Sequence, residues 1–168
     1  NRLIQGDVGS GKTIVAMLAA SIVIGNKSQV AVMAPTEILA EQHHISFLEY
    51  CKELDINCQI LIGAHTPKQK KKIKDDLRNG KIQIIVGTHA LIQGTVEFDN
   101  LGMIIIDEQH RFGVEHRKML IEKGYNPEIL AMTATPIPRT LAFAIHGDMD
   151  ISIIDELPKN RLPIITKV

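Results

Sequence analysis

The sequence Gly6-Asp7-Val8-Gly9-Ser10-Gly11-Lys12-Thr13 decides the fold of this chain. It matches the pattern GxxxxGK[ST], in which a glycine-rich turn joins a strand to a helix. The short apolar run Leu3-Ile4-Gln5 precedes it, and residues 13–24, rich in Ala, Leu, Met and Val, follow it with helical periodicity. The stretch therefore predicts a strand, a loop and a helix in succession, which is the repeating unit of α/β domains.

Five further apolar runs predict the other strands, at residues 30–34, 60–62, 82–86, 103–106 and 129–132. The runs are continuous rather than alternating, which is typical of strands buried on both faces. Helical segments lie between them, at residues 36–54, which open with a Thr cap, and at residues 68–78, which end at Asn79-Gly80. We therefore predict an α/β fold with a parallel β-sheet and helices on both faces. Ligands bind such sheets at the carboxyl ends of the strands.

The composition limits the classes of function. The 168 residues, 45% of them hydrophobic, suffice for one domain with a core. The 19 basic and 19 acidic residues give a formal net charge of zero, which excludes a polybasic, purely electrostatic nucleic-acid binder. Aromatic residues make up 4% of the sequence and Trp is absent, which argues against a surface that binds single-stranded nucleic acid by stacking its bases.

Cys51 and Cys58 are too few for a disulfide framework, and we predict that both are reduced and lie in or near the core. Two reduced cysteines without a secretory signal indicate a cytoplasmic location. The longest apolar stretches are too short to span a bilayer, so we expect no membrane partner. The chain starts at Asn1 rather than at a methionine and enters a strand almost at once. We interpret it as part of a larger protein.

The chemistry of residues 6–13 points to bound phosphates. Glycines let backbone N–H groups turn inward around phosphates, and the start of the following helix adds the positive end of its dipole. Lys12 would place its ammonium on the β- and γ-phosphates, and the Thr13 hydroxyl would be a ligand of Mg²⁺. The alternative is a glycine-rich turn with an exposed lysine. We assign the whole loop to nucleotide binding: Gly6, Asp7, Val8, Gly9, Ser10, Gly11, Lys12 and Thr13.

Two carboxylates follow the apolar run at residues 104–106, in the sequence Asp107-Glu108-Gln109-His110. Burying carboxylates at the end of an apolar strand costs free energy of folding, so their presence there indicates a functional role. Asp107 would hold Mg²⁺, and Glu108 would orient and activate an attacking water molecule. The alternative is that Asp107 only caps a helix, which does not account for the remaining residues of the motif.

Five motifs in order resemble those of the first RecA-like domain of superfamily 2 helicases. Gly6 to Thr13 resembles motif I, and Ala34-Pro35-Thr36-Glu37-Ile38-Leu39-Ala40-Glu41-Gln42-His43 resembles motif Ia. Gly87-Thr88-His89-Ala90-Leu91 resembles motif Ib, Asp107 to His110 resembles motif II in its DExH form, and Thr133-Ala134-Thr135 resembles motif III.

Extensions of these motifs narrow the resemblance to the RecG family of bacterial helicases, with the transcription-repair coupling factor as the nearest rival. They are Asp107-Glu108-Gln109-His110-Arg111-Phe112-Gly113-Val114 and Met132-Thr133-Ala134-Thr135-Pro136-Ile137-Pro138-Arg139-Thr140-Leu141. Gln109 favours RecG, and so does Ser152-Ile153-Ile154-Asp155-Glu156-Leu157-Pro158 with Arg161 and Pro163 after it.

The resemblance implies an ATP-dependent, Mg²⁺-using DNA translocase and helicase, monomeric and bacterial. Such an enzyme acts on branched DNA in repair and recombination, where it regresses replication forks and moves Holliday junctions. Residues 1–156 would be the first ATP-binding motor domain and residues 157–168 a linker. A wedge domain and a second RecA-like domain would lie elsewhere in the protein. Without the second domain we expect the chain to hydrolyse almost no ATP.

The resemblance also implies a role for each matching residue. Lys12 and Thr13 hold phosphate and Mg²⁺, Asp107 holds Mg²⁺ and Glu108 is the catalytic base. Gln109 and His110 link hydrolysis to movement, and Thr133 and Thr135 belong to the loop that couples ATP to DNA. The residues that resemble contacts to the DNA backbone are Pro35, Thr36, Gln42, Gly87, Thr88 and His89.

Other interpretations remain open at this point. A P-loop nucleotide switch is one, although it needs neither the DExH motif nor Thr133-Ala134-Thr135. A DExH RNA helicase is another, opposed only by the family-specific extensions. The lysines at residues 68, 70, 71, 72 and 74 indicate either a solvated helix face or a DNA-facing patch.

Overall fold

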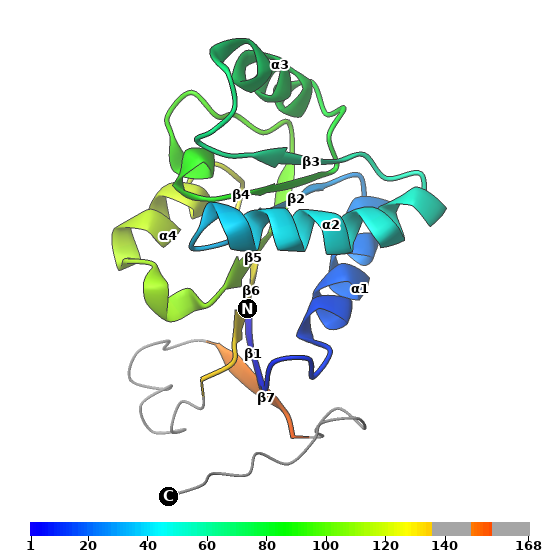
Figure 1. The fold of residues 1–168 in the computed structure, drawn as a ribbon, viewed down its shortest axis with the longest axis vertical. Coiled ribbons are helices and arrows are strands. Elements are labelled where there is room, and N and C mark those ends of the chain that lie inside the picture. The colour runs from blue at the N-terminus through cyan, green and yellow to red at the C-terminus, as the bar shows by residue number, and fades with distance from the viewer. Residues whose placement is uncertain (136–148, 156–168) are drawn as a thin grey trace, which may run out of the picture.

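The computed structural model describes residues 1–135 and 149–155, which form a seven-stranded sheet flanked by helices (Figure 1). The strand order is β3-β4-β2-β5-β6-β1-β7, and every neighbouring pair is parallel. The strands are β1 Arg2–Gly6, β2 Gln29–Met33, β3 Cys58–Leu61, β4 Ile84–Gly87, β5 Leu101–Asp107, β6 Glu128–Thr133 and β7 Asp150–Ile154.

Helices cover both faces of the sheet, which confirms the predicted α/β fold. One face carries α1 Lys12–Gly25 and α2 Glu37–Glu53. The other carries α3 Pro67–Arg78, α4 Val114–Ile121 and the short 3₁₀ helix η1 His89–Ile92. A second 3₁₀ turn, η2 Gln109–Arg111, follows β5 directly. Figure 1 shows α1 and α2 together on one side of the strands and α4 on the other.

The sheet separates two apolar cores because successive side chains of a strand point to opposite faces. In β2, Val30 and Val32 join the core under α1 and α2, whereas Ala31 and Met33 join the core under α3 and α4. All five residues of β2 are buried. This double burial explains why the central strands appear in the sequence as continuous apolar runs.

Local sequence signals set the helix boundaries. Thr36 is the N-cap of α2, where its Oγ1 accepts a hydrogen bond from the amide of Leu39. Thr66 and Gln69 form a capping box at the start of α3. That helix ends at Arg78, and Gly80 follows with a φ of 68°. These two helices therefore begin and end close to where the sequence predicts.

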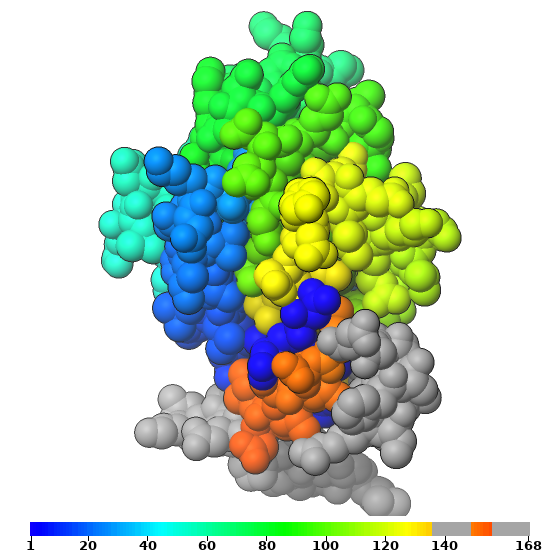
Figure 2. All heavy atoms as spheres, turned by 180° about the vertical axis from the view of Figure 1, so that it is seen from behind, coloured from blue at the N-terminus to red at the C-terminus, as the bar shows by residue number. Residues whose placement is uncertain are grey.

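The structure departs from the predicted elements by two residues or more in five places. Strand β3 starts at Cys58 rather than at residue 60, β4 starts at Ile84 rather than at residue 82, and β5 starts at Leu101 rather than at residue 103. Helix α4 and strand β7 were not predicted. Strand β7 pairs with β1 from Arg2↔Asp150 to Gly6↔Ile154, so the N-terminal strand lies inside the sheet. Figure 2 shows this blue strand between the orange β7 and the yellow β6.

Several predicted features fall outside the described residues. These are the part of the motif III extension from residue 136 to 141 and the proposed linker at residues 157–168. Within residues 1–135 and 149–155, Cys51 and Cys58 are both buried and free, as predicted. In that same part of the chain, no helix combines the length and apolar character needed to cross a membrane.

Candidate active site

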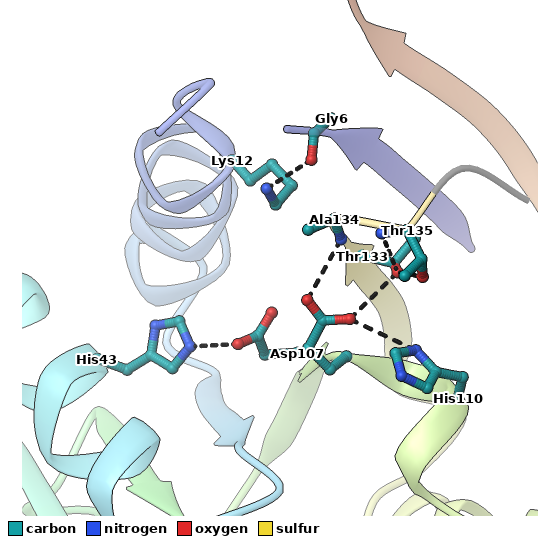
Figure 3. Close-up of polar contacts among 9 residues, drawn as sticks. Gly6, Lys12, His43, Asp107, His110, Thr133, Ala134 and Thr135 are labelled. Atoms are coloured by element: carbon teal, nitrogen blue, oxygen red, sulfur yellow. Dashed lines mark hydrogen bonds and ion pairs between the residues drawn. The ribbon is translucent and has the colours of Figure 1, made fainter. Parts of the chain in front are cut away.

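The predicted nucleotide site forms at the carboxyl ends of three adjacent strands, β5, β6 and β1. The glycine-rich loop follows β1, Asp107 ends β5 and Thr133 ends β6. A cavity of ≈ 500 Å³ opens there, and its lining includes Lys12, Thr13, Asp107, Glu108 and Thr135. Residues separated by more than 100 positions in sequence are thus gathered by the sheet order alone (Figure 3).

Backbone conformation makes glycine necessary in the loop. Gly9 and Gly11 have φ values of 81° and 95°, in the left-handed region that glycine adopts without a steric penalty. Gly11 is also the N-cap of α1, so the turn leads directly into the positive end of that helix. Val8 and Gly9 of the loop, and Lys12 and Thr13 of the first turn of α1, line the cavity.

Lys12 is held by the backbone of its own loop. Its Nζ donates to the carbonyl oxygens of Gly6 and Asp7, each at 2.8 Å. Figure 3 shows the side chain reaching from the start of α1 to the end of β1. An ammonium has three donors, so one remains for a ligand in the cavity.

Asp107 is buried at the end of β5 and is hydrogen-bonded to a histidine from α2. The distance from His43 Nε2 to Asp107 Oδ2 is 2.7 Å, and both side chains are about one-eighth exposed (13% and 12%). Figure 3 shows that the second oxygen of this carboxylate points away from His43. Because an ionised carboxylate only accepts hydrogen bonds, Nε2 carries the hydrogen in this pair.

Glu108 adopts a left-handed backbone conformation, with φ 48° and ψ 54°. A residue other than glycine there is held by its surroundings and commonly marks a functional site. Its Oε1 accepts from the amide of Ala134 at 3.3 Å, and its Oε2 accepts from Thr133 Oγ1 at 3.2 Å. His110 Nδ1 lies 3.4 Å from the same Oε2. The predicted base is therefore bonded to the turn after β6.

The predicted coupling residues Thr133 and Thr135 contact each other. Their hydroxyl oxygens are 2.8 Å apart, and the amide of Thr135 donates to Thr133 Oγ1 at 3.2 Å. Thr133 is 1% exposed, whereas Thr135 is exposed at the cavity. Gln109 is 3% exposed within η2. The coupling roles of Gln109 and His110 stay predictions.

The residues predicted to contact DNA follow β2 and β4, which are neighbours in the sheet. The amide of Ala34, just before Pro35, donates to the carbonyl of Gly87 at 2.9 Å, which places the two loops side by side. Thr36 and His89 are exposed, while Gly87 and Thr88 are buried.

Two of these residues also have structural tasks that the resemblance did not imply. Thr36 caps α2, and the ring of His89 packs against those of Phe112 and His116, with centroids 5.5 and 4.6 Å away. Gln42 lies exposed on α2. Contact with DNA stays a prediction for the whole group.

The oxygen donors at the cavity fit Mg²⁺. Thr13 offers a hydroxyl and Asp107 a carboxylate, which are the hard ligands that this ion prefers when it also keeps several waters. Lys12 and the loop amides complement the phosphates that accompany such an ion. The residues present therefore suit a Mg²⁺–nucleotide.

The sequence interpretation missed three parts of the site. His43 was named only as the last residue of the stretch that resembles motif Ia, and its contact with Asp107, 64 residues away, is not specified by either motif. The amide of Ala134 is invisible to side-chain motifs. Arg111 lines the cavity, although the sequence motifs gave it no role beyond its place in the extension of motif II.

Comparison with known proteins agrees with the motifs. The chain is 59% identical to the ATP-dependent DNA helicase RecG of Aquifex aeolicus, with 100% of this chain and 22% of that protein aligned. It is 53% identical to RecG of Thermotoga maritima, over 99% of this chain and 21% of that protein. The chain thus spans about a fifth of the length of these relatives.

Solved structures match the fold. A RecG bound to a three-way DNA junction superposes with a TM-score of 0.79 at 49% identity, covering 97% of this chain and 22% of that one. The DUF1998 helicase MrfA bound to DNA has a TM-score of 0.70 at 21% identity and shares the fold alone. The predicted resemblance to the first RecA-like motor domain of RecG is thereby confirmed. The DEAD/DEAH box helicase family model matches residues 1–143, and this chain belongs to that family.

Proposed function

We propose that this chain is the first motor domain of an ATP-dependent helicase that moves on branched DNA. The observation that carries the proposal is the bonding of Glu108 to Thr133 and Ala134. The carboxylate best placed to act on an attacking water is thereby connected to the turn that would couple ATP to DNA. A nucleotide switch needs the phosphate loop and a metal ligand, but it has no use for this connection.

Each residue of the cavity has a separate task in this proposal. Lys12 and the loop amides bind the β- and γ-phosphates, while Thr13 and Asp107 hold Mg²⁺. The ion, when bound, neutralises charge that develops on the transferred phosphate. Glu108 accepts a proton from the attacking water. Because Thr133 and Ala134 hold its two oxygens, a displacement of Glu108 would be passed to the turn after β6.

The relatives support a proposal for the substrate and for the wider organisation. A RecG structure holds a three-way DNA junction, which supports branched DNA over RNA as the partner of this chain. The greater length of the relatives supports a second RecA-like domain and a wedge domain in the same protein. We propose a monomeric cytoplasmic enzyme that regresses forks and migrates Holliday junctions during repair and recombination.

The test is steady-state phosphate release by the full-length protein and by residues 1–168 alone. We expect forked DNA to stimulate ATP turnover more than linear duplex DNA or duplex RNA does, and Lys12→Ala to abolish it. We expect almost no turnover from residues 1–168 alone. A clear preference for GTP would favour the switch, and stimulation by RNA alone would favour an RNA helicase. Turnover by the isolated chain at the full-length rate would contradict the two-domain proposal.

A further inference from the structure

The contact between His43 and Asp107 joins two parts of the molecule with different predicted tasks. Asp107 is the predicted Mg²⁺ ligand at the end of β5, and His43 belongs to α2, which starts at the predicted DNA-facing loop. Their 2.7 Å hydrogen bond is mostly shielded from water. A charge-assisted hydrogen bond of this length between shielded groups fixes the orientation of both side chains.

The geometry leaves the carboxylate able to bind a metal. His43 occupies Oδ2, and the other oxygen points away from it (Figure 3). Carboxylates that bind metals are commonly held by a hydrogen bond from a neighbouring side chain, which sets the direction of the remaining lone pairs. His43 therefore stands where such an orienting group is needed.

The helix that carries His43 is anchored at its first turn. Thr36, Leu39 and His43 lie three and four residues apart and so share one face of α2. Thr36 Oγ1 accepts from the amide of Leu39, and both Leu39 and His43 line the nucleotide cavity. Seven residues at 1.5 Å per residue place His43 about 10 Å along the helix from Thr36. Glu37 also binds the amide of Gly63 at 2.6 Å.

We propose that His43 is a positioning residue for Asp107, and that through it α2 connects the DNA-facing loop with the metal site. This inference rests on the proposed ATPase function. His43 does not touch substrate in this account. It sets the orientation in which Asp107 meets Mg²⁺, and a displacement of α2 on binding DNA changes that orientation.

The test measures the binding of a fluorescent ATP analogue by the full-length protein during a Mg²⁺ titration, and separately in EDTA. We expect His43→Ala to raise the half-saturating Mg²⁺ concentration about 10- to 100-fold, the usual effect of losing a group that orients a metal ligand. Affinity in EDTA should not change. The side chain of His43→Gln places an N–H about as far from the backbone as Nε2 does, so this variant should recover most of the Mg²⁺ affinity. The side chain of His43→Asn is too short, so that variant should not. His44→Gln is the matched control, since His44 faces the carbonyl of Cys58 instead.

Each outcome decides a different point. A Mg²⁺ titration of His43→Ala or His43→Asn that coincides with that of the wild type would overturn the positioning role. Loss of stability without a change in the Mg²⁺ titration would show that the pair only holds the fold together. We expect forked DNA to lower the half-saturating Mg²⁺ concentration of the wild type more than that of His43→Ala, and an equal effect would overturn the connection through α2. Absence of Mg²⁺-dependent nucleotide binding by the wild type would refute the proposed function itself.

Discussion

Replacing Glu108 by Gln should remove the catalytic base and preserve the structure around it. The Gln oxygen can accept from the amide of Ala134 in place of Oε1. Its amide nitrogen can donate to Thr133 Oγ1, because a hydroxyl oxygen accepts as readily as its hydrogen donates. Thr133 can then turn its own hydrogen toward Thr135, 2.8 Å away. The hydrogen bonds of residue 108 to Thr133 and Ala134 therefore both have a replacement.

The size of the effect follows from the lost proton transfer. A positioned general base contributes about 10²- to 10⁴-fold to a rate. Glu108→Gln should therefore lower ATP turnover by that factor, which corresponds to about 3 to 5 kcal/mol of barrier. Nucleotide affinity should stay within about twofold, because Lys12, Thr13 and Asp107 are untouched. The free energy of unfolding should change by less than about 1 kcal/mol, because the hydrogen bonds to Thr133 and Ala134 are replaced rather than lost.

Two further variants separate chemistry from structure. Glu108→Ala removes the carboxylate that accepts hydrogen bonds from Thr133 and Ala134. It should therefore lower ATP turnover as Glu108→Gln does, and also lower the free energy of unfolding by about 1 to 3 kcal/mol. Glu122→Gln changes an exposed carboxylate at the end of α4 and should alter neither quantity. Phosphate release with forked DNA, nucleotide binding and urea unfolding are the measurements. Turnover of Glu108→Gln within threefold of the wild type would refute its role as the base.

Other predictions concern the turn after β6, the packing of β4 and the two thiols. Thr133→Val should lower the free energy of unfolding in urea by about 1 kcal/mol, since it removes a buried hydroxyl with three contacts. Gly87→Ala should lower it by about 1 to 3 kcal/mol, because the added Cβ would lie 2.5 Å from the carbonyl oxygen of Leu61. In the control Gly25→Ala the Cβ meets no atom within 4 Å, so stability should rise by up to about 1 kcal/mol. Burial raises the pKa of both the Cys51 and the Cys58 thiol, which depletes the reactive thiolate, so a disulfide reagent at pH 8 should label neither cysteine until urea unfolds the chain. Rapid labelling of the native protein would contradict this.

The sequence predicted those features whose physical cause is local. The glycine-rich loop depends only on residues 6–13 and on the strand and helix on either side of it. The central strands appear in the sequence as apolar runs because both faces of the sheet are buried. Helix α4 was missed because its residues, VEHRKMLI, form a short segment with little apolar periodicity. Strand β7 was missed because it lies at the edge of the sheet and is only partly buried.

The interior of the site could not be predicted, because it depends on contacts between distant segments. The pairing of His43 with Asp107 brings a residue of α2 to the carboxyl end of β5, 64 positions further along the chain, which no local pattern specifies. Glu108 combines a left-handed backbone conformation with bonds to residues 133 and 134, which are 25 and 26 positions away. Motifs identified the residue types at the nucleotide cavity, and the sheet order determined which of them meet.

The position of β1 between β6 and β7 has a consequence for how the chain folds during synthesis. Arg2 pairs with Leu130 on one side and with Asp150 on the other, so β1 has no strand partner until nearly the whole domain has been made. Contacts between such distant residues form slowly, because a long loop must close before they stabilise the chain. The nucleotide loop is therefore synthesised before the strands that hold β1 in the sheet, and it is fixed in place last. A polypeptide that stops before Asp150 would leave the strand that carries this loop at an open edge of the sheet.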